Sequence, residues 1–244
     1  MYKYVAKYFI PSKVYKFCSL TAMPAFIIGM ITFLLSSYFV IYSLPADVEQ
    51  QEIYRILFIH VPSAILSELI YLFLAVNGFI YLVWRTKISA IFLNSAISIG
   101  LIFTAIVLIS GSIWGKPTWG TYWVWDARLT SELILLFLYI GIIALYSSFS
   151  DKRQAVKITS LLTIVGLVNI PIIHFSVEWW NTLHQGPSVT KFDQPSMHIS
   201  MLLPLFYMFL VFNLYFVAVL IKRVQLGIYS REKKSKWMEE YLNG

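Results

Sequence analysis

The sequence predicts an all-α integral membrane protein with six transmembrane helices, and three observations lead to that fold class. First, 59% of the 244 residues are hydrophobic and only 13% are charged, whereas about a quarter of an ordinary soluble domain is charged. Second, six apolar segments are each long enough to cross about 30 Å of hydrocarbon as a helix. Third, the basic residues fall mostly on alternate connections. We expect a single six-span membrane domain over residues 1–244.

The six apolar segments cover roughly residues 20–44, 61–84, 91–113, 131–149, 155–175 and 199–221. We expect helices because a backbone in lipid has to satisfy its hydrogen bonds within the segment. No small-residue cleavage site follows the first segment, so we expect an anchor rather than a cleaved signal. Proline costs least near helix ends, and this is where we expect Pro24, Pro62, Pro171 and Pro204.

The basic residues predict how the chain is oriented. Fifteen of the 19 Lys and Arg residues lie in the two tails and in the second and fourth connections; the other side holds Arg55, Lys116, Arg128 and Lys191. Short basic loops stay inside, so we expect both termini in the cytoplasm. The connections at roughly 45–60, 114–130 and 176–198 are then periplasmic. The net charge of +7 mostly reflects this topology. It also favours contact with anionic membrane lipid, and its spread over tails and turns argues against nucleic-acid binding.

The second periplasmic connection is rich in tryptophan. Residues 114–132 read "WGKPTWGTYWVWDARLTSE" and contain Trp114, Trp119, Tyr122, Trp123 and Trp125. One or two such residues would only mark a membrane interface. Four indoles within twelve residues, with glycines that allow close approach, favour a surface for a large, flat, partly apolar ligand.

The same run carries local helix signals. Trp119 and Trp123 are four residues apart and would share a face in a helix. Asp126 and Arg128 follow, and we expect Thr130 or Ser131 to cap the next span.

All four histidines lie on or near the predicted outer face. His60 stands at the mouth of the second span and His184 in the third outer connection, and two neutral imidazoles from separate connections can bind one porphyrin iron. We expect His174 and His198 to be packing or surface residues. Zinc would need more ligands than these connections offer, and the single cysteine, Cys18, excludes a cysteine cage.

Two carboxylates fall within the apolar segments. Glu68 lies inside the second span, where a carboxylate is costly and indicates a ligand path, a proton path or a packing contact. We favour a neutral, hydrogen-bonded Glu68. Glu132 starts the fourth span, where it suits the helix dipole.

The run "WGKPTWGTYWVWDARLTSELILLFLYIG" resembles the tryptophan-rich WWD signature of heme-handling membrane proteins. The resemblance is closest to the heme exporter protein C family, also called cytochrome c maturation protein C. "YRILFIHVPSAI" around His60 and "NIPIIHFSVEWWNTLHQG" around His184 support it, and it covers nearly the whole chain. Tyr122 stands where relatives commonly have tryptophan, which still leaves an aromatic face.

The resemblance implies a function and a site. It implies non-covalent binding of heme b at the periplasmic face of the bacterial inner membrane, with His60 and His184 as axial iron ligands. Arg55 or Arg128 could meet the heme propionates through charge-assisted hydrogen bonds. The full set of heme-binding residues expected is His60, His184, Trp114, Trp119, Tyr122, Trp123, Trp125, Asp126, Arg128, Arg55, Trp179 and Trp180.

The resemblance also implies partners. Heme would pass to a membrane-anchored periplasmic heme chaperone (CcmE) for cytochrome c maturation. Further expected partners are an ATP-binding subunit, a second permease-like subunit of the heme export complex and a small single-span protein. No enzymatic activity, and no ATP hydrolysis by this chain, is expected.

Two other functions stay open at this stage. A membrane cytochrome b-type redox subunit would usually hold heme between spans through mid-helix histidines, whereas these histidines cluster at the outer rim. A permease for heme or another small molecule would line a path with polar residues, in which the predicted spans are poor.

Overall fold

A computed structural model gives the structure of the protein and describes residues 10–186 and 197–243. Lys3, Lys7 and Lys191, and with Lys191 the centre of the predicted 176–198 connection, lie outside the described residues. The regular secondary structure of the described residues is all helical, without a β-strand. The helices are α2 (Pro11–Tyr42), α3 (Leu57–Trp84), α4 (Lys87–Trp119), α5 (Ala127–Ser148), α6 (Lys152–Gly166), α7 (Asn169–Trp179), α8 (Ile199–Glu232) and α9 (Lys236–Asn243), with a short 3-10 helix η1 (Glu52–Ile56) before α3.

Six stretches of the described chain are long and apolar enough to cross a membrane: α2, η1 with α3, α4, α5, α6 with α7, and α8. The predicted all-α, six-span fold class is therefore confirmed. The spans are longer than the apolar runs because helix continues past the hydrocarbon-length segment into the polar flanks. A backbone that leaves the lipid still gains from its internal hydrogen bonds.

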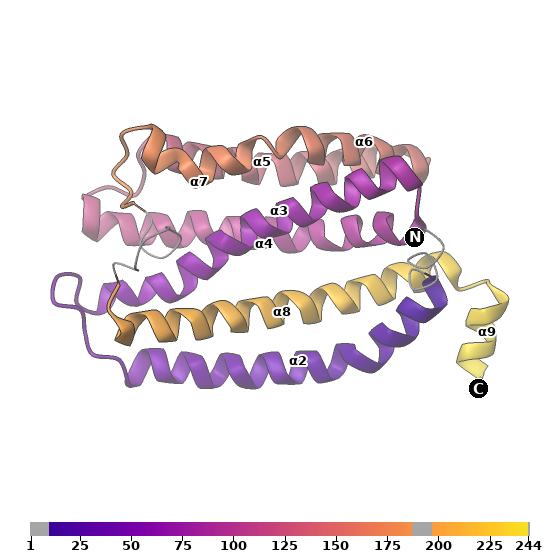
Figure 1. Cartoon of the computed structure of the whole chain (residues 1–244), viewed down its shortest axis with the longest axis horizontal. Coiled ribbons are helices and arrows are strands. Elements are labelled where there is room, and N and C mark those ends of the chain that lie inside the picture. Colours follow the sequence, from indigo (N-terminus) through magenta and orange to yellow (C-terminus); the bar gives the residue numbers. More distant parts are fainter. Residues whose placement is uncertain (1–9, 187–196, 244) are drawn as a thin grey trace.

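The helices pack around α3 and α4, which cross at the centre of the bundle (Figure 1). On one side α5, α6 and α7 cover this pair. On the other side α8 packs against both central helices, and α2 packs chiefly on α8. The core includes the fully buried side chains of Phe58, Tyr71 and Tyr139. Most of the apolar surface of α2 is left exposed, as expected for a helix that faces lipid.

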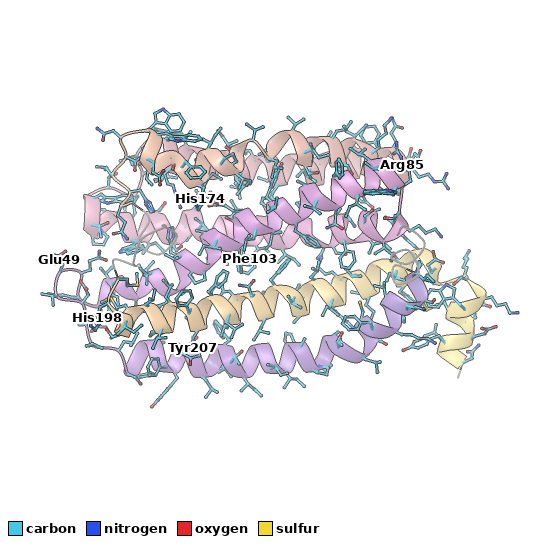
Figure 2. The ribbon with its side chains drawn as sticks, viewed as in Figure 1. Glu49, Arg85, Phe103, His174, His198 and Tyr207 are labelled. Carbon is cyan, nitrogen blue, oxygen red and sulfur yellow. The ribbon has the colours of Figure 1, made fainter. Side chains whose placement is uncertain are left out.

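The two ends of the bundle differ in what they carry. Figure 2 shows Glu49 and His198 at one end, with His174 nearer to that end, and Arg85 at the other. We call the first the tryptophan end, because the connections after α2, α4 and α7 all lie there (Figure 1). We call the other the basic end, which holds the α3–α4 and α5–α6 turns and α9. The grouping agrees with the predicted alternation; that the tryptophan end is periplasmic stays a prediction.

The first half of the tryptophan-rich run is helix rather than connection. α4 continues to Trp119, and the hydroxyl of Thr118 donates to the carbonyl of Trp114 in the last turn (2.8 Å). The helix ends at Gly120, whose φ of +80° is a left-handed conformation that glycine adopts readily. Trp119 and Trp123 therefore do not share one helix, and that expectation was wrong.

Two further local expectations were wrong. Asp126, not Thr130 or Ser131, caps α5, because its carboxylate accepts a hydrogen bond from the Leu129 N–H (2.9 Å). Pro24 lies in the middle of α2 rather than near an end. Figure 1 shows α2 bending in its first half, as expected where a proline removes one helical hydrogen bond.

The fifth span is two helices rather than one. α6 ends at Gly166 and α7 begins at Asn169, with a tight turn between them. Pro171 explains the break, because it has no N–H for the carbonyl of Leu167 and its ring crowds that carbonyl.

Candidate functional site

Two cavities lie side by side at the tryptophan end. The first encloses about 850 Å³, its open mouth included, between α3, α4, α5 and the connection after α7. The second encloses about 1200 Å³ between α3, α7 and α8. Six residues line both cavities: His60, Ala64, Trp114, Arg128, His184 and Gln185. The two spaces therefore meet at one wall, and the two predicted iron ligands belong to it.

His60 and His184 face each other across this wall. His60 comes from the first turn of α3 and is only 9% exposed, while His184 comes from the connection after α7. Their ring centres are 6.5 Å apart, with the ring planes inclined by 32°. Two imidazoles that bind one metal ion from opposite sides, at about 2.0–2.1 Å per bond, have ring centres about 6–6.5 Å apart. The observed separation matches that requirement.

The hydrogen bonds fix which nitrogen of each ring is free. His184 Nδ1 lies 3.0 Å from the backbone carbonyl of Gln185, which can only accept, so Nδ1 carries the proton. His60 Nδ1 lies 3.0 Å from Ser110 Oγ. Ser110 Oγ donates its own proton to the carbonyl of Ile106 (2.6 Å) and therefore accepts from His60. Both Nε2 atoms keep a lone pair, which is the arrangement of a metal-binding histidine.

The surroundings of His184 favour its neutral form. Burial lowers the pKa of His184 below its ordinary value, and the positive charge of Arg128 lowers the pKa further. A hydrogen bond from the His184 backbone N–H to the Thr182 hydroxyl (3.0 Å) also holds the local turn. The ring is thus kept both in position and in the protonation state that binds a metal.

Tryptophans form the aromatic part of the first cavity. Trp114 stands edge-on to His60, with ring centres 5.7 Å apart, and Trp119 stands edge-on to His184 at 6.2 Å. Trp114 is held by a hydrogen bond from its Nε1 to Gln50 Oε1 (2.8 Å). Trp123 also lines the cavity, and its buried Nε1 has no partner among the described residues. A buried N–H of this kind is available to a ligand.

Charged side chains line the cavities together with the histidines. Arg128 lines both cavities and donates from Nη1 to the carbonyl of Ile173 (2.9 Å). Glu132 lines the first cavity, is 5% exposed and accepts a hydrogen bond from Ser67 Oγ (3.0 Å). Its carboxylate therefore belongs to the cavity wall as well as to the start of α5.

The second cavity has a carboxylate–imidazole pair. Glu68 Oε2 lies 3.7 Å from His174 Nδ1, and both side chains line the cavity. His174 is exposed, as expected for a packing or surface residue, and its contact with Glu68 is an additional feature. Sequence spacing does not reveal this pair, because Glu68 is on α3 and His174 is on α7, beyond the break in the fifth span.

Half of the twelve residues expected to bind heme are brought together. His60, His184, Trp114, Trp119, Trp123 and Arg128 all line the first cavity, and we call them the inner group. The other six, which we call the outer group, line neither cavity: Arg55, Tyr122, Trp125, Asp126, Trp179 and Trp180.

The polar members of the outer group make local structural contacts. Arg55 pairs with Glu52 and donates to the carbonyls of Val40 and Leu44, so it ties the connection after α2 to the end of that helix. Asp126 is the cap of α5. Neither side chain lines either of these two cavities, so Arg128 is the arginine that they share among the described residues.

The aromatic members of the outer group lie at the surface near the cavity mouth. Trp125 is 77% exposed and stands edge-on to Trp123, with ring centres 5.5 Å apart. Trp179 stacks on Phe175 at 5.4 Å, and Trp180 stands edge-on to Trp179 at 5.7 Å. The ring of Tyr122 lies under Lys116 Nζ.

Sequence reasoning missed three residues that support the inner group. Gln50 holds Trp114, Ser110 orients His60, and Gln185 supplies the carbonyl that orients His184. Single polar residues of this kind have no spacing signal. Only the fold shows which ring each one meets.

The fold and the site together define a multi-pass helical membrane protein with a pocket of paired histidines and tryptophans at one end. The family described as Heme exporter protein C (CcmC) matches residues 4–239, and the chain belongs to this family.

Relatives are similar over most of their length. "Heme exporter protein C" of Haemophilus influenzae is 42% identical over 242 residues, which is 98% of this chain and 97% of the relative. "Heme exporter protein C" of Escherichia coli K12 is 48% identical over 198 residues, 81% of this chain and 80% of the relative. A "putative cytochrome c biosynthesis ccmC-like mitochondrial protein" of Marchantia polymorpha is 45% identical over 188 residues, 76% and 79% of the two chains.

Proposed function

We propose that this protein binds heme b non-covalently at the tryptophan end and delivers it to a periplasmic heme chaperone for cytochrome c maturation. The observation that carries the proposal is the histidine pair, with both Nε2 lone pairs free and ring centres 6.5 Å apart, between two cavities. The family and the printed names of the relatives, which refer to heme export and cytochrome c biosynthesis, support it.

The donor set fits a heme. A bound heme would supply an iron that can take imidazole lone pairs as ligands. His60 and His184 would supply these ligands, and a flat macrocycle held between them would extend into the two cavities that meet there. Trp114, Trp119 and Trp123 offer the apolar contact area that a porphyrin needs.

The propionates of the heme need a cationic partner. Arg128 is the arginine that lines both cavities, so we assign it this role in preference to Arg55, whose guanidinium is occupied by Glu52 and two carbonyls. Charge-assisted bonds between arginine and carboxylate are among the stronger hydrogen bonds in proteins. Glu132 and Glu68 also line the cavities, and a propionate beside either carboxylate would be unfavourable, so we place the propionates at Arg128.

The surface around the cavity mouth suits a protein that takes over the heme. The indoles of Trp125, Trp179 and Trp180 are half or more exposed there, and exposed aromatic residues are enriched where proteins dock. His184 lies on a connection rather than in a helix, so its bond to the iron can be released without disturbing a span. Non-covalent binding, no enzymatic activity and location in a bacterial inner membrane belong to the same proposal.

The further partners follow from the proposed function. A delivery protein that lacks an energy source of its own would act beside an ATP-binding subunit, a permease-like subunit and a small single-span protein of a heme export complex. A cytochrome b-type redox subunit fits the geometry less well. His60 stands in the first turn of α3 and His184 outside a helix, whereas a heme held between spans needs mid-helix ligands.

Heme transfer tests the proposal directly. The purified, heme-loaded protein is mixed with the purified periplasmic domain of the chaperone, and heme on each partner is followed by absorbance after separation. We expect heme to move to the chaperone domain, and to move much more slowly from a Trp125→Ala/Trp179→Ala/Trp180→Ala variant that is equally loaded. Heme that stays on this protein, or that cycles redox state with quinol instead, would overturn the delivery role.

A further inference from the structure

A third cavity lies at the basic end, remote from the histidine pair. It encloses about 710 Å³, its opening included, between α4, α5 and α8. Its lining contains two arginines, three small polar side chains and a tyrosine, but no acidic residue: Ile91, Asn94, Ser95, Tyr146, Arg223, Leu226, Gly227, Ser230 and Arg231. Such a lining suits an anion.

The cavity lies at the depth of the lipid head groups. Ile91 and Ser95 are in the first turns of α4, which starts at Lys87, so they lie only about 6–12 Å from the helix start at 1.5 Å per residue. Tyr146 is in the last turn of α5, and Arg231 is in the last turn of α8. Tyrosine and arginine both favour this interfacial depth.

One arginine is already held in place for a ligand. Arg223 donates from Nε to the carbonyl of Ser95 (2.8 Å), which fixes the guanidinium, and its terminal nitrogens bond no other described residue. Arg231 makes no ion pair with a described residue; its neighbour Glu232 pairs instead with Lys87 (2.9 Å). Two guanidinium groups therefore face one cavity without a protein carboxylate to neutralise them.

Two features beside the cavity bear on its charge and its packing. Lys152 Nζ lies over the Tyr146 ring, 5.0 Å from its centre. α4 and α8 approach closely at Gly227, where an added Cβ would lie 2.9 Å from Ile91 Cγ2. The missing side chain at this position lets α8 pack closely on α4 beside the cavity.

The surface beside the cavity indicates a lipid rather than a soluble anion. α5 and α8 both pack on α4 but make little contact with each other, so a strip of α4 between them is open to the membrane. Ile102 and Ile109 lie on this strip, 58% and 61% exposed, at seven-residue intervals from Ser95 and thus on the same helix face. An acyl chain can lie along them while its head group occupies the cavity.

We propose that the cavity between α4, α5 and α8 binds the phosphate group of an anionic phospholipid, with Arg223 and Arg231 as the phosphate ligands. Basic pockets between membrane helices commonly hold such head groups. The site is independent of the heme site, so its failure or success leaves the proposed function untouched.

Native mass spectrometry of the purified protein tests the site. The protein is titrated in detergent with dioleoylphosphatidylglycerol or dioleoylphosphatidylcholine, and bound lipid is counted. We expect the wild type to retain phosphatidylglycerol preferentially. An Arg223→Gln/Arg231→Gln variant should bind it roughly 25-fold more weakly, at about fivefold for each charge. Lys233→Gln/Lys234→Gln removes the same charge outside the cavity and should change binding by less than about twofold.

A single variant and two controls for folding complete the experiment. Arg231→Gln alone makes no change to a described hydrogen bond, so it should stay folded and weaken binding by about fivefold. Circular dichroism and gel filtration check the fold of each variant. Three results would each overturn the proposal: no preference for phosphatidylglycerol, equal loss in the arginine and lysine variants, or inorganic phosphate that binds at least as tightly as phosphatidylglycerol. The last result would assign the cavity to a soluble anion.

Discussion

The inner and outer groups of predicted site residues have similar composition but different positions. The inner group contains five aromatic or imidazole rings and one charged residue, the outer group contains four aromatic rings and two charged residues, and both lie at the tryptophan end. The inner group lines a cavity, whereas the outer group caps helices, ties connections or lies exposed at the rim. The comparison teaches that composition points to the end of the molecule that carries the candidate site, and that only the fold separates residues that line its cavity from residues that surround it.

The largest expected difference between the groups concerns iron ligation. His60→Ala or His184→Ala removes one axial bond and should weaken heme retention by more than about 100-fold, since changes outside the ligand sphere alone often cost 10–100-fold. Added imidazole should partly restore binding to each single variant. The control is His198→Ala, because the side chain of His198 bonds only Ser200 among the described residues, at the start of α8. An equal loss of heme from His198→Ala would contradict the assignment of His60 and His184 as the iron ligands.

The tryptophans test the same comparison through contact area. Replacing Trp114, Trp119 and Trp123 together by alanine should weaken heme binding by at least about 100-fold, because each indole contributes a large apolar area at about 25 cal/mol per Å². Replacing Trp125, Trp179 and Trp180 should change binding by less than about threefold. Isothermal titration or spectral titration of heme measures both. If the two triple variants behaved alike, the run would act as an interfacial belt and the division into groups would be wrong.

A smaller effect is expected from the residue that orients His60. Ser110→Ala removes the acceptor of the His60 Nδ1–H, and loss of such a support typically lowers metal affinity by about 10–100-fold; we expect the lower end, because the helix still holds the ring. Ser112 is on the same helix and lines the cavity without a hydrogen bond to either histidine, so Ser112→Ala serves as the control. The readout is the heme dissociation rate, and an unchanged rate in Ser110→Ala would argue against the assigned tautomer.

The smallest effect concerns pH. Heme binding needs a neutral His184, and burial and Arg128 lower the pKa of that ring, while Asp126 acts in the opposite direction. Binding should therefore persist as the pH falls through about 6.5, the ordinary histidine value, and should be lost only as it falls through the lower pKa of His184. Arg128→Gln should move this loss toward higher pH. Equilibrium heme binding measured across the range would contradict this account if the loss occurred at or above the ordinary value.

The fold was largely predictable because the length of each apolar segment and the positions of Lys and Arg can be read directly from the sequence. Six spans and the clustering of the outer connections needed no tertiary information. The end of α4 at Trp119 was missed because polar and aromatic residues interrupt the apolar run, while the helix continues to Gly120. The break before α7 was missed because Pro171 was expected near the end of one continuous span. In the structure, its missing N–H and its ring instead end the hydrogen-bonded helix before Asn169.

The types of residue in the candidate site were predictable from the sequence, but the contacts between their side chains were not. His60, His184 and the tryptophans stand out by residue type and sequence neighbourhood. The division of Trp123 from Trp125, the pairing of Glu68 with His174, and the roles of Gln50 and Ser110 depend on how α3, α4 and α7 pack. None of these has a spacing pattern, so none could be read from the sequence.

The central claim is that His60 and His184 bind one heme iron from opposite sides. Electron paramagnetic resonance of the purified ferric protein tests this claim most directly, because two axial imidazoles give a low-spin iron. The account predicts a low-spin signal in the wild type, a high-spin signal in whatever heme His60→Ala or His184→Ala retains, and a return to low spin with added imidazole. A high-spin wild type, or a low-spin signal that survives both substitutions unchanged, would contradict the account.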